Sequence, residues 1–223
     1  MDAHELNAAL VDYLVREGII GDPRIESAFR AVLRHHFLPG LPLETVYSDD
    51  AILTHIDHGI ATSSSSQPAI MAEMLDQLGA QPGDNVLEIG AGTGYNAAIL
   101  QHIAGPTGHV TTVDIDPVFV QEASAHLQQA GCPRVEVICA DGFKGYPPNA
   151  PYDRIIVTAA ASRVVPAWED QLKSGGRIVL PLIIYGGEFE TQASTAYEKR
   201  EDGLHELSAV GCGFMLMRHP GEP

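Results

Sequence analysis

A glycine-rich turn between a predicted strand and a helical pattern is the feature that most constrains the fold of this chain. The run 86–89 leads into Gly90-Ala91-Gly92-Thr93-Gly94, and a helical pattern follows over 96–103. Glycines at such a junction let a ligand approach the backbone, because side chains there would block it. The turn therefore predicts a nucleotide-like ligand, with a tight strand-to-helix turn that binds nothing as the alternative.

Strands and helices alternate on both sides of this turn. Such alternation is typical of a parallel sheet with right-handed crossovers. We therefore predict an α/β, Rossmann-like fold with a mostly parallel sheet and helices on both faces. The strands are predicted at 85–89, 109–113, 135–139, 154–158 and 177–182, and the helices at 68–78, 96–103, 118–130 and 168–172, with a turn at Gly175-Gly176.

The two ends of the chain carry different patterns. Apolar residues at helical spacing predict two short helices before residue 34, followed over 35–66 by loop with short strands. Near the other end, Asp202-Gly203 is a strong turn signal, and it predicts a hairpin between 195–197 and 206–210 that forms an antiparallel edge of the sheet. Met215 and Met217 are interpreted as a half-buried terminal strand.

The length of 223 residues predicts one domain over 1–223, made of an N-terminal helical and loop extension over 1–66 and a Rossmann-like core over 67–223. Thirteen Lys and Arg against 29 Asp and Glu give a net charge of −16, which argues against nucleic acid as a partner. No apolar run is long enough for a membrane helix, so we expect no membrane association and a cytoplasmic protein.

Cysteines and histidines do not form a metal-binding pattern. Cys132, Cys139 and Cys212 contain no Cys-x-x-Cys pair and are predicted to be reduced thiols. His55 and His58 stand three residues apart, but they belong to no metal-binding motif. We therefore predict no metal site and interpret these histidines as polar loop residues.

Three acidic residues sit where predicted strands end or hand over to a turn. Asp114 follows Gly94 by 114 − 94 = 20 residues, which matches the step at which a carboxylate meets ribose hydroxyls, although a helix N-cap is the alternative. Asp141 precedes Gly142 after the third core strand, where the carboxyl ends of neighbouring strands line one crevice. A plain turn residue before glycine is an equally compatible interpretation of Asp141. The turn lacks the Gly-x-Gly-x-x-Gly spacing of pyrophosphate binders and begins with Glu88. These features favour S-adenosyl-L-methionine, which has no phosphate and carries a sulfonium cation.

Several segments resemble the protein L-isoaspartyl (D-aspartyl) O-methyltransferase family. They are Ala140-Asp141-Gly142, the block that begins Ala150-Pro151-Tyr152-Asp153, the runs 86–95 and 171–177, and Ser66-Gln67-Pro68. The resemblance spans roughly residues 33–181, and the second and last of these segments are the most specific to the family. It implies a class I methyltransferase that uses S-adenosyl-L-methionine to methylate the carboxylate of L-isoaspartyl residues in proteins or peptides, leading to succinimide formation and repair.

The resemblance also implies a set of site residues. Ser66 matches the serine treated as the active-site residue of the family. A carboxylate is ionised at neutral pH, so the reaction needs alignment and exclusion of water rather than a base. Ser66 is thus expected to orient the substrate, with a place near a helix start as the alternative. The implied cofactor contacts are Ser63, Ser64, Ser65, Ser66, Glu88, Gly90, Ala91, Gly92, Gly94, Asp114, Ile115, Asp141 and Gly142.

Departures from the family pattern gather in 33–66, the region expected to touch substrate. Ser64-Ser65 stands in place of Thr-Ile, and Leu33-Arg34 in place of Pro-Arg. Other functions therefore stay open. One is a peptide-tailoring enzyme that methylates aspartate in a dedicated ribosomal peptide, and another is a non-catalytic S-adenosylmethionine-binding protein. A nicotinamide oxidoreductase is disfavoured by the glycine spacing.

Overall fold

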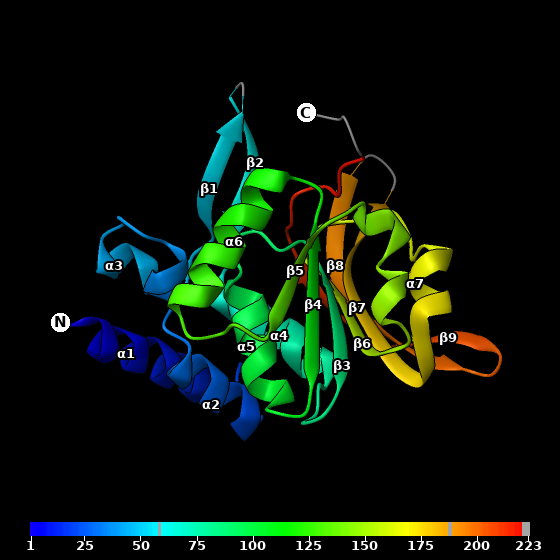
Figure 1. Ribbon diagram of the computed structural model, residues 1–223, viewed down its shortest axis with the longest axis horizontal. Helices are drawn as coiled ribbons and strands as arrows, with labels where there is room; N and C mark the ends of the chain where they lie inside the picture. The colour runs from blue at the N-terminus through cyan, green and yellow to red at the C-terminus, as the bar shows by residue number, and fades with distance from the viewer. Residues whose placement is uncertain (58, 187–188, 220–223) are drawn as a thin grey trace.

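The computed structural model describes residues 1–57, 59–186 and 189–219. Its main sheet has seven strands in the order β5-β4-β3-β6-β7-β8-β9 (Figure 1). The pairs among β5, β4, β3, β6 and β7 are parallel, and β8 pairs antiparallel with both β7 and β9. This confirms the predicted fold class and its antiparallel edge. The strands are β3 Asn85–Ile89, β4 His109–Asp114, β5 Val135–Cys139, β6 Tyr152–Val157, β7 Leu172–Gly186, β8 Phe189–Arg200 and β9 Gly203–Cys212.

Helices cover both faces of this sheet. α4 (Pro68–Leu78), α5 (Tyr95–Ala104) and α6 (Pro117–Gln129) contribute to one apolar cluster, whereas α7 (Pro166–Gln171) contributes Trp168 to the other. Neighbouring residues of β3 divide between the clusters, because successive side chains of a strand point to opposite faces: Val86 packs in the first and Leu87 in the second. None of the described helices is long and apolar enough to cross a membrane.

The N-terminal extension packs on the first of these clusters. Its helices are α1 (Ala3–Arg16), α2 (Pro23–Ala31), the 3-10 turn η1 (Arg34–Phe37) and α3 (Leu43–Val46). The carboxylate of Asp2 caps α1 by accepting from His4 N and Glu5 N, and Asp22 caps α2. On α2, Phe29 meets Tyr95 of α5 edge-on, with ring centroids 6.3 Å apart, so the extension is joined to the core by buried aromatic packing.

The extension ends in an antiparallel hairpin of β1 (Ile52–Asp57) and β2 (Ile60–Ser65). This confirms the short strands expected within 35–66. In Figure 1 the hairpin projects past the carboxyl ends of the parallel strands and lies beside α6. It therefore stands at the end of the sheet where doubly wound folds bind ligands.

One predicted turn is wrong. Gly175-Gly176 lies inside β7, which runs on from α7 without a break. Tyr152 pairs with Leu172 and Arg154 with Arg177. Between these two pairs β7 therefore advances by five residues and β6 by two. The glycines occupy this bulge, where a Cβ on Gly176 would lie 2.9 Å from Leu172 Cδ1. Gly175-Gly176 therefore indicates a bulge within β7 and not a turn before it.

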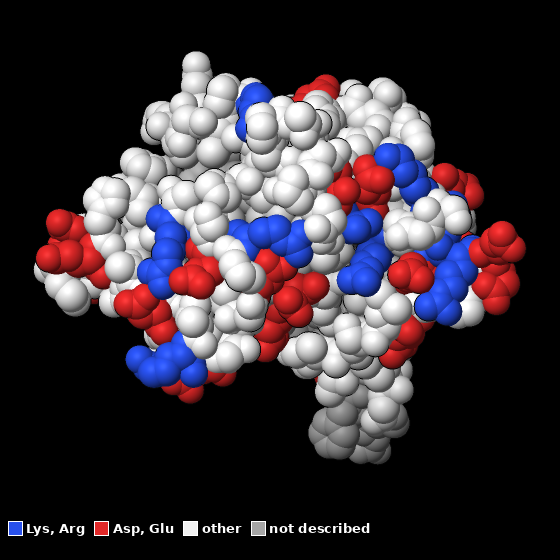
Figure 2. Space-filling model, turned by 90° about the horizontal axis from the view of Figure 1, so that it is seen from below, with Lys and Arg blue, Asp and Glu red and all other residues white. Residues whose placement is uncertain are grey.

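Charged side chains crowd the end of the molecule where the parallel strands begin. Figure 2 views this end from below and shows Lys and Arg lying among Asp and Glu. Arg154 Nε lies 3.5 Å from Asp84, and Lys173 Nζ lies 2.8 Å from Asp153. These two cations are therefore occupied by neighbouring acids.

Candidate active site

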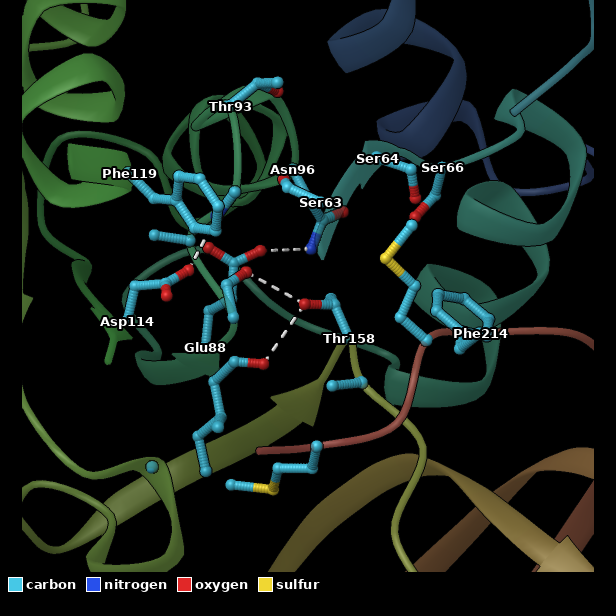
Figure 3. Close-up of a pocket in the computed structure, with 18 of the residues that line it drawn as sticks. Ser63, Ser64, Ser66, Glu88, Thr93, Asn96, Asp114, Phe119, Thr158 and Phe214 are labelled. Atoms are coloured by element: carbon cyan, nitrogen blue, oxygen red, sulfur yellow. Dashed lines mark hydrogen bonds between the residues drawn. The ribbon is translucent and has the colours of Figure 1, made fainter. Parts of the chain in front are cut away.

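A pocket opens at the carboxyl ends of β3, β4 and β6. Its walls are the end of β2, the glycine turn after β3, the end of β4, the loop after β6 and a C-terminal segment over 214–218. In the close-up of Figure 3, Asp114 and Phe119 lie at one end of the pocket, and Ser64, Ser66 and Phe214 lie at the other. The pocket thus has an acidic end and a hydroxyl-bearing end.

Most site residues expected from the resemblance line this pocket. Gly94 and Asp141 are not among the lining residues. Gly94 has φ 87° at the start of α5, and a Cβ there would lie 3.2 Å from Ala123 O on α6. The Asp141 carboxylate accepts from Phe143 N at 3.1 Å and caps a 3-10 turn. The lining residues among those expected are Ser63, Ser64, Ser65, Ser66, Glu88, Gly90, Ala91, Gly92, Asp114, Ile115 and Gly142.

Glu88 is a fully buried carboxylate in the pocket wall, carried by β3. Asn96 Nδ2 donates to one of its oxygens at 2.7 Å, and Thr112 Oγ1 donates to the other at 2.6 Å. Burial raises the pKa of Glu88 to about 7 in spite of these hydrogen bonds, and the nearby carboxylate of Asp114 acts in the same direction. A cationic ligand beside Glu88 would favour its ionised form.

Asp114 ends β4 and holds the glycine turn. Its Oδ2 accepts from Gly92 N at 3.0 Å, and its Oδ1 accepts from Asp116 N at 3.2 Å. Asp116 caps α6 separately by accepting from Val118 N at 2.8 Å. The two acids therefore have different tasks. Burial raises the pKa of Asp114, while the hydrogen bonds from backbone N–H groups act in the opposite direction and favour its carboxylate.

The glycine turn keeps the pocket open. Gly90 has φ 104°, and a Cβ there would lie 2.4 Å from Thr158 Oγ1, which donates to Gly90 O at 2.8 Å. Gly92 has φ 49°, and a Cβ there would point toward Ser64 O at 3.9 Å. A side chain at either position would strain the backbone, and at Gly92 it would enter the cradle between the turn and β2. This cradle and the two carboxylates fit a nucleoside-type cofactor that carries a positive charge.

Arg34 fixes the serine segment, and sequence reasoning had not assigned it a role. Its guanidinium is completely buried, and Nη2 donates to Ser66 O at 2.9 Å and to Ser65 Oγ at 3.3 Å. Nη1 donates to Val46 O at 3.0 Å. Desolvation lowers the pKa of Arg34. The signal available in the sequence was that Arg34 matches the arginine of the Pro-Arg pair in the family pattern.

Asp49 anchors the segment from its other side. Its Oδ1 accepts from Ala69 N at 2.9 Å, and its Oδ2 accepts from Gln67 Nε2 at 3.1 Å. The carboxylate thus caps the start of α4 from outside the helix, where Pro68 has no backbone N–H to offer. Ser66 sits between this cap and Arg34, and it lines the pocket in a defined position.

The C-terminal segment 214–218 was missed as a pocket wall. The interpretation of Met215 and Met217 as a terminal strand is wrong, because this stretch makes only an isolated bridge between Leu216 and Ala160. Ala160 N donates to Met215 O at 2.7 Å, and Met217 N donates to Ala160 O at 2.9 Å. Chain ends carry no periodic signal for such a covering segment.

The histidines near the pocket have protein partners. His55 on β1 lies 3.3 Å from a carboxylate oxygen of Glu122 and packs its ring on Phe119, with centroids 4.6 Å apart. His35 Nδ1 lies 2.7 Å from the hydroxyl of Tyr47. His58 lies outside the described residues. Among 1–57, 59–186 and 189–219, no group of three or more His, Cys, Asp or Glu is arranged to hold a metal ion.

Comparison with known proteins gives one consistent family. The family model described as protein-L-isoaspartate(D-aspartate) O-methyltransferase (PCMT) matches residues 4–215. A protein-L-isoaspartate O-methyltransferase of Methanopyrus kandleri is 39% identical over 208 residues, which are 92% of this chain and 88% of the relative.

Solved structures agree in fold. A protein-L-isoaspartate O-methyltransferase superposes with a TM-score of 0.86 at 30% identity over 96% of this chain, which spans only 66% of that longer chain. A putative enzyme of the same name from Plasmodium falciparum, in complex with S-adenosyl-L-homocysteine, superposes with a TM-score of 0.78 at 18% identity, covering 98% of this chain and 99% of that one. At that identity, the second match supports the fold alone.

Proposed function

This chain belongs to the protein-L-isoaspartate(D-aspartate) O-methyltransferase family, and on that basis we propose how its pocket carries out the reaction. The enzyme uses S-adenosylmethionine to methylate the free carboxylate of isoaspartyl residues. One observation carries the proposal for the site. A single pocket holds the carboxylates of Glu88 and Asp114 at one end and the hydroxyl of Ser66 at the other.

We assign the acidic end to the cofactor. Asp114 stands where a carboxylate accepts from ribose hydroxyls in folds of this class, and the glycine turn beside it lets the nucleoside approach the backbone. Glu88 lies deeper and offsets positive charge on the cofactor. When bound, S-adenosylmethionine supplies a methyl group on a sulfonium sulfur, an electrophile that an ionised carboxylate can attack directly.

We assign the serine end to the substrate. The substrate carboxylate is ionised at neutral pH and needs no base, so the protein contributes orientation and exclusion of water. The Ser66 hydroxyl donates a hydrogen bond to one carboxylate oxygen and leaves the other free to attack. After release, the neighbouring backbone nitrogen displaces methanol from the ester and forms a succinimide, which water opens partly to normal aspartate.

Proteins and peptides that contain isoaspartate are the proposed substrates. Exchanging Ser66 for Ala tests the assignment of the substrate end. The Ser66→Ala variant should lower kcat for an isoaspartyl peptide at least tenfold and leave the Kd for S-adenosylhomocysteine within twofold. Ser162→Ala, in an exposed loop outside the pocket, is the matched control. A kcat within twofold of wild type in Ser66→Ala would remove Ser66 from the site.

A dedicated peptide substrate is the second candidate, and the hairpin favours it. Leu53 of β1 pairs across the hairpin with Ser64, so both side chains share the face that borders the pocket. Leu53 is 56% exposed, and Ile56 and Ile60 nearer the tip are 64% and 62% exposed. Such an apolar rim suits contact with one preferred extended peptide. A kcat/KM that varies less than tenfold across unrelated isoaspartyl peptides would argue for general repair instead.

We also propose that the protein works in a reducing compartment such as the cytoplasm. Cys132, Cys139 and Cys212 are all free thiols. Structural disulfides are typical of proteins from oxidising compartments, and free thiols persist in reducing ones.

A further inference from the structure

Among the described residues that line the pocket, Arg218 is the only Lys or Arg. It follows the pocket residue Met217 in the C-terminal segment and is half-buried. The hydrogen bonds and ion pairs among residues 1–57, 59–186 and 189–219 include none from its guanidinium. A half-buried guanidinium has five donors to satisfy, so it is ready to bind an anion that enters from solution.

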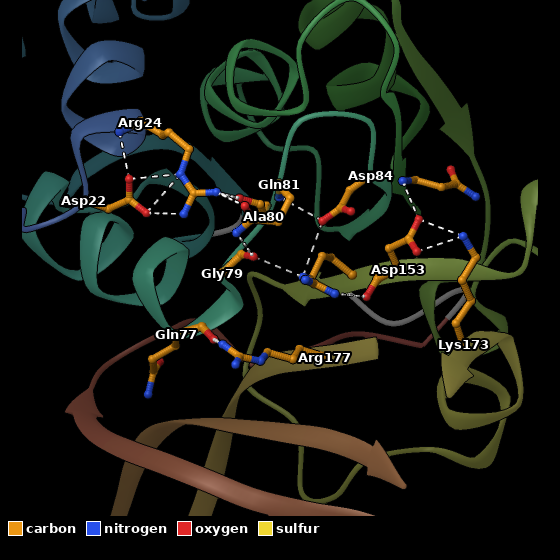
Figure 4. A network of polar contacts seen from close by, with 12 residues as sticks. Asp22, Arg24, Gln77, Gly79, Ala80, Gln81, Asp84, Asp153, Lys173 and Arg177 are labelled. Carbon is orange, nitrogen blue, oxygen red and sulfur yellow. Dashed lines mark hydrogen bonds and ion pairs between the residues drawn. The ribbon is translucent and has the colours of Figure 1, made fainter. Parts of the chain in front are cut away.

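Arg34 lies beside this pocket, but it is fully buried and occupied by backbone carbonyls and Ser65. Several further cations are tied to acids or carbonyls far from the pocket. Figure 4 shows Arg24, Arg177 and Lys173 in a polar network at the opposite end of the sheet. There Arg24 pairs with Asp22, and the Lys173 ammonium donates to both oxygens of Asp153 at 2.8 Å. In a chain with a net charge of −16, this leaves the pocket short of positive charge.

The ligands of the proposed reaction bring carboxylates into an acidic pocket. Glu88 and Asp114 already place two carboxyl groups in its wall, and a third carboxylate entering a partly buried site is repelled unless a cation accompanies it. Arginine suits this task, because its planar fork donates two parallel hydrogen bonds to one carboxylate. Serine hydroxyls supply no charge for this purpose.

We propose that Arg218 binds a carboxylate in this pocket. The inference rests on the function proposed above, and two carboxylates are available there: that of the isoaspartyl residue and that of the amino-acid part of the cofactor. The same chemistry serves either one. Substrate binding would then depend on a residue of the C-terminal segment as well as on Ser66.

The backbone around Arg218 is held independently of its side chain. Met217 N donates to Ala160 O at 2.9 Å, and the ring of His219 stacks on Phe143 with centroids 4.1 Å apart. These contacts do not involve the guanidinium. Replacing Arg218 should therefore leave the segment in place and the melting temperature unchanged within about 2 °C.

The test compares Arg218→Gln and Arg218→Lys with Arg163→Gln. Arg163 is an exposed cation in the loop after β6, outside the pocket, so its removal changes the net charge equally. Three quantities are measured for each purified variant: KM for an isoaspartyl peptide, Kd for S-adenosylhomocysteine, and Kd for 5′-methylthioadenosine, which lacks the amino-acid carboxylate. The control should stay within twofold of wild type in all three.

A tenfold or larger rise in KM for Arg218→Gln, with both Kd values unchanged, assigns the substrate carboxylate to Arg218. A tenfold weaker Kd for S-adenosylhomocysteine, with that for 5′-methylthioadenosine unchanged, assigns the cofactor carboxylate. In either case Arg218→Lys should weaken binding less than Arg218→Gln does, because lysine keeps the positive charge. All three quantities within twofold of wild type in Arg218→Gln would overturn the proposal. A wild-type enzyme inactive on isoaspartyl peptides would contradict the proposed function instead, and the two thioether ligands would still test Arg218.

Discussion

The Nη2 atom of Arg34 donates a hydrogen bond of 2.9 Å to the carbonyl oxygen of Ser66. Arg34 belongs to the N-terminal extension and Ser66 to the pocket wall, so this contact ties the position of the proposed substrate-orienting hydroxyl to a buried side chain outside the core. The same guanidinium donates to the carbonyls of Val46, Ser48 and Asp50. One buried cation thus holds the segment 46–50 and the serine segment together beside the pocket.

Replacing Arg34 by Lys should lower turnover, because an ammonium cannot reach all of these acceptors in one geometry. We expect kcat to fall at least tenfold and the free energy of unfolding to fall by about 3 kcal/mol, the scale for breaking a buried hydrogen-bond network. Single-turnover rates at saturating cofactor and urea denaturation measure the two effects. Arg30→Lys, at an exposed position of α2, is the control. Wild-type kcat in Arg34→Lys would contradict a positioning role.

Asp114→Asn should weaken cofactor binding by at least tenfold. The change removes the negative charge. It also replaces one carboxylate oxygen by an amide NH2, which cannot accept the hydrogen bond from Gly92 N. Asp116→Asn is the control, since Asn is as good an N-cap as Asp and Asp116 serves only α6 and its own turn. Calorimetric titration with S-adenosylhomocysteine would show equal affinities for the two variants if Asp114 has no part in the site.

Glu88 should make the ligand-free protein less stable as pH rises. Its pKa is raised from 4.5 to about 7 in the folded state, so its contribution is fully present below pH 4.5 and is lost as pH rises to about 7. The loss amounts to about 3 kcal/mol at 1.36 kcal/mol per pKa unit. Urea unfolding of wild type and Glu88→Gln from pH 5 to pH 8 isolates this contribution. Identical pH profiles for the two proteins would show that Glu88 titrates normally.

Gly90→Ala should abolish cofactor binding, whereas Gly105→Ala should not. Both glycines have positive φ, so each substitution costs about 1 kcal/mol of backbone strain. Only at Gly90 would the new Cβ meet another atom, Thr158 Oγ1 at 2.4 Å, whereas Gly105 has open space. Thermal melting in the presence and absence of S-adenosylhomocysteine tests this. A normal ligand-induced shift in Gly90→Ala would mean that the turn can rearrange.

The parallel core could be predicted from the sequence because its signals are local. The strand at 85–89 is mostly apolar and is followed directly by glycine, and Asp202-Gly203 marked the antiparallel edge. The bulge at Gly175-Gly176 could not be predicted, because strand continuity depends on pairing with β6. The first apolar cluster takes residues from α1 and α2 as well as from α4 and α5, so we propose that the chain is one domain.

The site could be predicted in part. Glu88 and Asp114 were found because they stand at fixed distances from the glycine turn, and both line the pocket. Arg34 and the segment 214–218 were missed, because their part in the pocket arises from contacts across more than 30 and 50 residues of chain, Arg34 with Ser66 and Met215 with Ala160. No periodicity or motif records such contacts.

The central claim is methyl transfer to isoaspartyl carboxylates. The most direct test incubates the purified enzyme and methyl-labelled S-adenosylmethionine with two peptides of identical sequence, one with isoaspartate and one with normal aspartate at the same position. Base-labile label should appear in the isoaspartyl peptide and stay at background in its partner. Label in neither peptide, or equal label in both, from enzyme that binds S-adenosylhomocysteine, would contradict the account.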